Sequence, residues 1–191
     1  MRTILLLPAL LLTACVVPPP GAFSRLAGPA RDGDVATLQR LVAAGADPNV
    51  QDPAANRWTP LMHAIHKNRL AAVRMLLERG AGADVPSSEG VTPLTLATAE
   101  GNPEIVQALL DRGADPRVGG GAALRNAVAG CAFDCNNKAL SSEELCKRQA
   151  AIVEALLREA PDLELPGGFS GAFARSQAMW NGCDDLLALV H

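Results

Sequence analysis

The sequence has few aromatic residues, with no tyrosine, two tryptophans and four phenylalanines among 191 residues. It also lacks any block of basic residues, and its formal net charge is −3. Proteins that bind nucleic acid use a basic face and aromatic platforms on which bases stack. The composition therefore argues against a nucleic-acid partner.

Long apolar runs are missing as well. After position 15, no stretch is long and apolar enough to span a hydrocarbon core of roughly 30 Å. The first residues differ from the rest of the chain. Met1-Arg2 supplies a positive charge, and a short apolar stretch follows from Ile4 to Leu12. This arrangement is typical of an export signal that is removed after use. We therefore expect residues 1–14 to be a signal peptide.

The end of this signal, Leu12-Thr13-Ala14-Cys15, resembles the lipobox of bacterial lipoproteins. The resemblance implies that Cys15 receives acyl chains and becomes the mature N-terminus, so that a membrane is one partner of the chain. An ordinary secretory signal with an incidental cysteine is the alternative. In the lipoprotein family, an aspartate directly after the lipidated cysteine keeps the protein in the inner membrane. Since Val16 stands there, the resemblance implies the outer membrane, facing the periplasm.

A proline-rich segment follows the lipobox. Val16-Val17-Pro18-Pro19-Pro20-Gly21 cannot form a helix or a central strand, because proline lacks the N–H donor. We expect residues 15–22 to be an extended tether of polyproline character.

An internal repeat occupies the middle of the chain. Thr59-Pro60-Leu61 recurs thirty-three residues later as Thr92-Pro93-Leu94. Each copy continues with an alanine, a second apolar cluster and a closing glycine, Gly80 or Gly113. Threonine can cap a helix, proline suits the first helical position, and glycine suits the left-handed residue that ends a helix. The spacing therefore predicts two short helices in each copy, which must stack on their neighbours to bury their apolar faces.

The T-P-L opening and the L-L-x-x-G-A-D ending resemble the ankyrin repeat. The resemblance implies an all-α ankyrin-repeat solenoid over residues 23–191, with about five helix–turn–helix repeats and a loop or hairpin finger before each. We place the repeats at residues 23–56, 57–89, 90–120, 121–165 and 166–191, the outer two acting as caps. Extra residues lengthen the finger before Thr59, and an insertion from Cys131 to Ala150 interrupts the fourth repeat.

Ankyrin proteins of this kind bind other proteins through their fingers and the exposed side of their first helices. By repeat position, the resemblance places His66, Lys67, Glu100 and Trp180 at variable groove positions and Arg57 and Trp58 in a finger. Tryptophan and arginine dominate interface energetics. We therefore expect an unidentified protein partner to bind a groove that these six residues form. In the alternative view, Trp58 or Trp180 packs against the neighbouring cap.

Catalytic motifs are weak. His63 and His66 form H-x-x-H at i and i+3, but a zinc site needs at least three ligands, and the only other histidine is His191. Gly119-Gly120-Gly121 has no following Lys-Ser/Thr, so it is not a phosphate loop. We expect no cofactor and no catalysis.

Three classes of function stay open at this point. The first is a monomeric, lipid-anchored binding protein, either an immunity protein against a delivered toxin or a scaffold for a periplasmic enzyme. The second is a metal-dependent envelope enzyme that uses His63 and His66. The third is a purely structural envelope lipoprotein.

The four cysteines after Cys15 form an even set, which in an oxidising compartment indicates disulfides. Four cysteines allow three connectivities. We favour Cys135 with Cys146, which closes the insertion into a loop, and Cys131 with Cys183, which joins the fourth repeat to the fifth. A redox pair and a metal site are the alternatives, but Cys131 and Cys135 have three intervening residues, one more than a redox motif has.

Disulfide pairing predicts that the denatured, non-reduced protein reacts with almost no thiol probe. Reduction should then release four reactive thiols for each chain. Mass spectrometry before and after alkylation measures both numbers. Several free thiols in the non-reduced protein would contradict the pairing.

Overall fold

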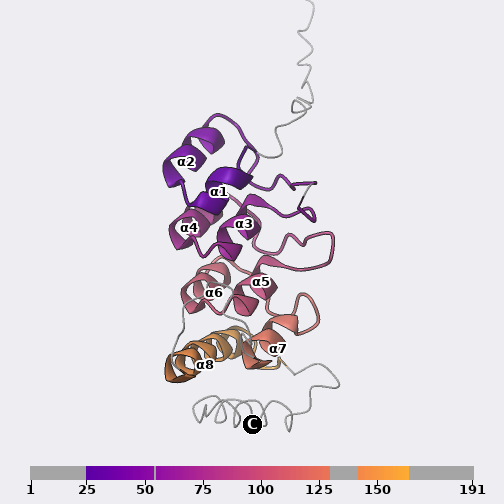
Figure 1. The fold of residues 1–191 in the computed structure, drawn as a ribbon. Helices are drawn as coiled ribbons and strands as arrows, with labels where there is room; N and C mark the ends of the chain where they lie inside the picture. The colour runs from indigo at the N-terminus through magenta and orange to yellow at the C-terminus, as the bar shows by residue number, and fades with distance from the viewer. Residues whose placement is uncertain (1–24, 54, 130–141, 164–191) are drawn as a thin grey trace, which may run out of the picture.

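The computed structural model describes residues 25–53, 55–129 and 142–163. Eight α-helices lie in these residues and form four consecutive pairs (Figure 1). In chain order they are α1 (Ala27–Asp32), α2 (Val35–Ala43), α3 (Pro60–His66), α4 (Leu70–Glu78), α5 (Pro93–Ala99), α6 (Pro103–Leu110), α7 (Ala122–Ala129) and α8 (Ser142–Glu159).

The helices form two layers. The first helices of the pairs, α1, α3, α5 and α7, contact one another in succession, and so do the second helices, α2, α4, α6 and α8. Long loops project beside the layer of first helices, on the right of Figure 1. The described residues contain no strand and one isolated antiparallel bridge, between Asp52 and Trp58. The predicted all-α solenoid is confirmed, and repeats one to four each supply one helix pair. The predicted fifth repeat, residues 166–191, lies outside the described residues.

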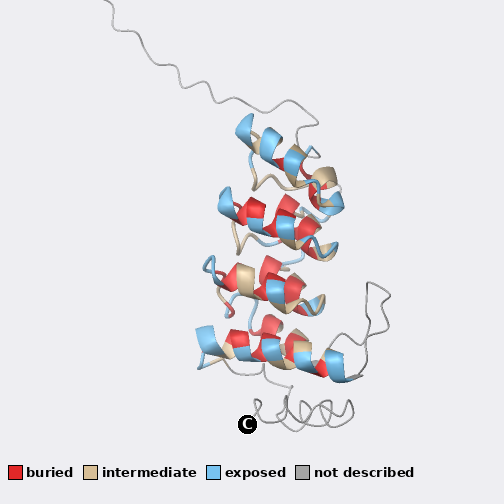
Figure 2. Cartoon of the chain, turned by 90° about the vertical axis from the view of Figure 1, so that its left-hand side faces the viewer, coloured by how far each residue is buried: buried red, intermediate tan, exposed pale blue. Residues whose placement is uncertain are grey.

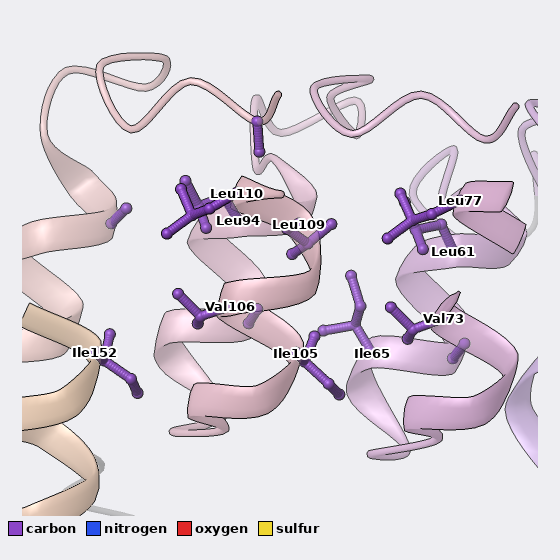
Figure 3. Close-up of a cluster of buried hydrophobic side chains, with 14 of the residues drawn as sticks. Leu61, Ile65, Val73, Leu77, Leu94, Ile105, Val106, Leu109, Leu110 and Ile152 are labelled. Carbon is purple, nitrogen blue, oxygen red and sulfur yellow. The ribbon is translucent and has the colours of Figure 1, made fainter. Parts of the chain in front are cut away.

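The apolar core runs continuously through the stack. Buried residues lie where the helices pack within each pair and against the neighbouring pairs, while most exposed residues lie on the outside (Figure 2). Figure 3 shows the clusters predicted from the repeat, with Val73 and Leu77 on α4 and Val106, Leu109 and Leu110 on α6. Because each pair covers apolar surface of the next, no pair can be stable alone.

The helix starts confirm the predicted capping. The hydroxyl of Thr59 accepts a hydrogen bond from Met62 N–H at 3.3 Å, and that of Thr92 accepts one from Thr95 N–H at 3.1 Å. A proline occupies the first turn of α3 and of α5, where the missing donor is harmless. A cap of this kind stabilises a helix by about 1 kcal/mol.

The helix ends also match the prediction. Gly80 and Gly113 have φ of 88° and 81°, the left-handed conformation that glycine adopts without strain. The first helices end in the same way, at Asn68 with φ 54° and Gly101 with φ 66°.

The first repeat keeps a helix despite its proline. The structure places α1 at Ala27–Asp32, with Pro29 as its third residue. The first turn of a helix has no intrahelical partners for its N–H groups, so proline removes no hydrogen bond there.

The fourth repeat requires a correction. The sequence predicts residues 142–150 as part of the insertion, but they form the first half of α8. Two ion pairs support this half, Glu143 with Lys147 at 2.7 Å and Glu144 with Arg148 at 3.3 Å, both at the i,i+4 spacing. The side chain of Cys146 continues the buried stripe of the helix. The predicted insertion therefore overlaps the outer helix layer.

One repeat position links each repeat to the next. It is the fourth residue after the glycine that ends a second helix, and it is occupied by Asn49, Asp84 and Arg117. Asn49 donates to Gly80 O at 3.0 Å and accepts from Gly82 N–H at 2.6 Å. The carboxylate of Asp84 accepts from the backbone N–H of Asp115 at 3.2 Å. The guanidinium of Arg117 pairs with the carboxylate of Asp162.

Asparagine should replace Asp84 without loss of stability. Burial raises the pKa of Asp84, and the nearby Asp115 carboxylate adds to this effect. The hydrogen bond from Asp115 N–H lowers the pKa but only partly offsets the increase. The folded state therefore disfavours the charged form of Asp84. Asp84→Asn keeps an acceptor and removes that charge. In urea unfolding at pH 7 we expect it to equal or exceed the parent, while Asp84→Ala loses about 1 kcal/mol. An Asp84→Asn protein less stable than Asp84→Ala would show that the hydrogen bond from Asp115 N–H does not stabilise the fold.

Candidate functional site

The finger before α3 is a tightly folded loop. Asp52 N–H donates to Trp58 O at 2.8 Å, and Trp58 N–H donates to Ala55 O at 2.8 Å. Between them, Asn56 and Arg57 adopt φ of 50° and 56°, in the left-handed region that non-glycine residues rarely enter. Each such residue costs on the order of 1 kcal/mol, so the surrounding contacts must hold the conformation in place.

Contacts with the next finger supply that support. The carbonyl of Asn56 accepts from Ser88 N–H at 2.8 Å and from the Ser88 hydroxyl at 2.9 Å. The Asn56 amide donates to the Glu89 carboxylate at 3.0 Å. Gln51 donates to Pro86 O at 2.9 Å. The fingers of repeats two and three are therefore joined side by side by several hydrogen bonds.

Trp58 lies against the first helix of its own repeat. Its ring centroid is 5.5 Å from that of His63 and 5.4 Å from that of His66, with interplanar angles of 60° and 73°. The residue is only partly buried. Trp58 therefore packs against the helix of its own repeat and stays only partly buried at the base of the finger.

His66 connects repeats two and three. Its Nδ1 lies 2.8 Å from Glu100 Oε1, and the two side chains are 38% and 8% exposed. A carboxylate accepts a hydrogen bond, so this contact favours the form of the ring that carries hydrogen on Nδ1. The opposite ring nitrogen, Nε2, is then the one available to a partner.

Glu100 has a buried side chain that positions His66. Its Oε1 contacts His66, and its Oε2 is buried without a hydrogen-bond partner among the described residues. The direct partner contact predicted for Glu100 stays a prediction, whereas its positioning of His66 is a feature of the structure.

His63 points inward, as its repeat position predicts. Its side chain is 14% exposed, and its Nε2 lies 3.8 Å from Asp52 Oδ2. Burial lowers the pKa of His63 below its usual value, and the nearby Asp52 carboxylate only partly opposes this effect.

The two histidines of H-x-x-H have different neighbours, since His63 faces Asp52 and His66 faces Glu100. Within the described ranges, no group of three or more histidine, cysteine, aspartate or glutamate side chains is placed to hold a metal ion. The metal-dependent alternative therefore has no third ligand in this part of the chain.

Of the three remaining predicted groove residues, the structure describes two. Arg57 and Lys67 are exposed, Arg57 in the finger and Lys67 at the C-terminal end of α3. Trp180 lies outside the described residues. The structure thus brings Trp58 and His66 into contact, and His66 and Glu100, and it leaves the sixth residue untested.

Three polar residues that hold the finger were not among the predicted site residues. Gln51, Asn56 and Glu89 fix the loop through hydrogen bonds within it or to its neighbour. A signal for such pairs exists in the sequence, because the linked residues lie one repeat apart. Asn56 and Glu89 are separated by 33 residues, and His66 and Glu100 by 34.

A hollow lies in the layer of second helices, between α4 and α6. It has a volume of about 450 Å³, and Arg74, Glu78, Glu104, Gln107 and Arg112 are among the residues that line it. Its charges have both signs, and Arg112 lies 4.0 Å from Glu78. Nothing in this lining selects one ligand class, so the hollow offers a control surface for tests of binding.

The predicted lipidation site Cys15 and the cysteines Cys131, Cys135 and Cys183 lie outside the described residues. Cys146 lies buried in α8 and is disulfide-bonded, with a partner outside the described residues. Which cysteine pairs with it stays a prediction. None of the described helices is both long and apolar enough to cross a membrane.

Comparison with known proteins identifies the repeat. Residues 26–119 match the family model for ankyrin repeats, in three copies. The chain is 36% identical over 90 residues to ankyrin repeat, SAM and basic leucine zipper domain-containing protein 1 of Mustela putorius furo, a match covering 45% of this chain and 18% of that protein. It is 35% identical over 108 residues to ankyrin repeat and KH domain-containing protein mask-1 of Caenorhabditis elegans, covering 56% and 4% respectively. The chain thus spans less than a fifth of these relatives, and the similarity concerns the repeats.

His63 should make stability depend on pH. Because its pKa is lowered in the folded state, the unfolded chain binds the extra proton first as pH falls. Its contribution to stability is therefore complete above about pH 6.5 and is lost as pH falls below that value. We expect the Tm to fall between pH 7.5 and pH 5.5, and to fall less in His63→Leu.

Lys67→Gln, which removes a charge from the same helix end, is the matched control and should keep the full decrease. Thermal unfolding followed by circular dichroism measures all three proteins. An identical decrease in parent and His63→Leu would show that His63 is not responsible.

Proposed function

Because residues 26–119 form ankyrin repeats, we propose that this chain is a binding protein and not an enzyme, and that its partner is another protein. The binding site is the repeat-two surface, which we define as Arg57, Trp58, His66 and Lys67. The observation that carries this proposal is the rigid finger, in which a strained loop presents Arg57 and Trp58 next to the exposed end of α3.

Preorganisation supports this choice of surface. Binding costs free energy when side chains and loops must be ordered, at roughly 0.5–1.5 kcal/mol for each long side chain. Here Asn56 and Gln51 already fix the finger against its neighbour, and Glu100 already orients His66. Strain of the kind found at Asn56 and Arg57 clusters at functional sites in proteins.

Trp58 is the central anchor of the proposed surface. Its ring packs against His63 and His66, and the residue as a whole is only partly buried. Buried aromatic anchors carry much of the energy of protein interfaces. Trp180, at the equivalent of a groove position in the last predicted repeat, is proposed to extend the same surface.

The proposed location is the outer membrane, on the periplasmic side. The supporting features are the charged and apolar start, the lipobox at Leu12 to Cys15, and Val16 in place of an aspartate. Each buried CH₂ of an acyl chain contributes about 0.8 kcal/mol to membrane binding. The tether at residues 15–22 would hold the monomeric repeat domain away from the bilayer.

Two roles fit a tethered binding protein. It could neutralise a toxin that is delivered into the periplasm, as an immunity protein does, or it could support a periplasmic enzyme as a scaffold. A metal-dependent enzyme fits less well, since His63 and His66 lack a third ligand among the described residues. A purely structural role gives no reason for the strained finger.

The proposal predicts selective capture of one protein. The tagged full chain, expressed in a Gram-negative bacterium and extracted in mild detergent after cross-linking, should retain a stoichiometric partner. Trp58→Ala and His66→Ala should each weaken capture by a factor of about 30, which corresponds to about 2 kcal/mol for an interface hot spot. Quantitative mass spectrometry measures the bound partner.

Two controls separate the parts of the proposal. Arg74→Ala/Glu104→Ala, in the hollow between α4 and α6, should capture the partner as the parent does. Cys15→Ser should move the chain from the membrane fraction to the soluble fraction and leave the repeat domain folded. Equal capture by parent and Trp58→Ala would refute the binding surface, and membrane retention of Cys15→Ser would refute the lipid anchor.

A further inference from the structure

The exposed charges of the repeat-two surface have one sign. Arg57 and Lys67 are exposed, and His66 beside them is partly exposed. Neither Arg57 nor Lys67 forms an ion pair with another described residue. This surface belongs to a chain whose net charge is −3, so its cations are not a consequence of overall composition.

The carboxylates of the same region are turned inward or engaged. The side chain of Asp52 is 16% exposed and lies beside His63, and that of Glu100 is 8% exposed beneath His66. Glu89, on the neighbouring finger, is exposed, but one of its oxygens accepts a hydrogen bond from Asn56. At this surface, Asp52 and Glu100 support the two histidines from inside, and Arg57 and Lys67 lie outside.

A neutral side chain holds Arg57 in place, so its positive charge is not paired with a described carboxylate. Its Nε donates to the amide oxygen of Gln51 at 2.9 Å, and Gln51 is itself fixed by its bond to Pro86 O. The two terminal nitrogens of Arg57 make no hydrogen bond to any described residue. Five of the eleven other described arginines lie within 4.0 Å of a carboxylate, namely Arg31, Arg112, Arg117, Arg148 and Arg158, and Arg57 is not among them.

A guanidinium anchored through Nε by a neutral group keeps its full charge and presents its two outer nitrogens in a fixed plane. That geometry matches the two oxygens of a carboxylate, which accept two parallel hydrogen bonds. Phosphate has a similar geometry, but binding to a phosphate backbone relies on neutralising many phosphates. Two free cations in an acidic chain suit single carboxylates on a protein better.

We propose that the partner presents an acidic segment to the repeat-two surface, with one carboxylate bound by Arg57 and a second near Lys67. Trp58 would pack against apolar side chains of the same segment. This inference rests on the proposed function, because it names the chemistry of the partner at that site. Complementary charge of this kind mainly raises the association rate and excludes wrong partners.

Selection from a random peptide library tests the chemistry even while the partner protein is unidentified. Twenty-residue peptides displayed on phage are selected at low salt on the immobilised full chain in detergent. We expect the retained peptides to be enriched in aspartate and glutamate relative to the unselected library. The tightest peptide, made synthetically, should bind about tenfold more weakly to Arg57→Gln and should lose affinity as salt rises.

Variants with matched charge sharpen the test. Arg57→Lys keeps the charge but loses the planar fork, so its affinity should lie between those of the parent and Arg57→Gln. Arg74→Gln/Arg79→Gln removes two exposed cations, one on α4 and one at its C-cap, and should bind the peptide as the parent does. Equal losses in Arg57→Gln and in the α4 variant would mean that only the overall charge matters, which overturns the inference.

The remaining outcomes separate the two proposals. Retained peptides that are neutral or basic, but that Trp58→Ala no longer binds, would overturn the acidic partner and leave the proposed site intact. Retained peptides that Trp58→Ala and Arg57→Gln bind as the parent does would overturn the repeat-two surface itself. No retained peptide at all would count against both proposals.

Discussion

Burial of apolar surface between neighbouring helix pairs is the constraint on which the structure depends. Each pair buries residues such as Leu76 or Leu109 completely, and the described helices that pack most closely belong to the same or the next pair. A chain built in this way is stable only as a stack. The stack in turn fixes where each finger emerges, because every loop must return from a second helix to the next first helix.

Polar contacts between neighbouring repeats add to the packing of the apolar core. Asn49, Asp84 and Arg117 occupy one repeat position and reach the next repeat with three different chemistries. The register between repeats is therefore maintained even though the side chains differ. At the fingers, the same kind of contact between repeats holds a loop whose backbone would be unfavourable alone.

The sequence predicts the repeated features of this fold well, and the irregular ones poorly. Thr59, Thr92 and the glycines that end the helices act locally, so their roles follow from residue type and spacing. The start of α8 could not be placed, because ion pairs within the helix extend it into a segment that breaks the repeat. The left-handed pair Asn56 and Arg57 was also unpredictable, since contacts with the neighbouring finger hold it there.

The site shows the same division. Trp58, His66 and Lys67 follow from repeat position, whereas the inward turn of Glu100 and the neutral anchor of Arg57 depend on packing across repeats. These cross-repeat bonds have an evolutionary consequence. Solenoids commonly change by duplication or exchange of whole repeats, but repeats two and three share the bonds of Asn56 and His66. Repeats two and three should therefore be inherited as one module. An exchange at their junction would remove the hydrogen bonds that hold the finger of repeat two and the one that orients His66.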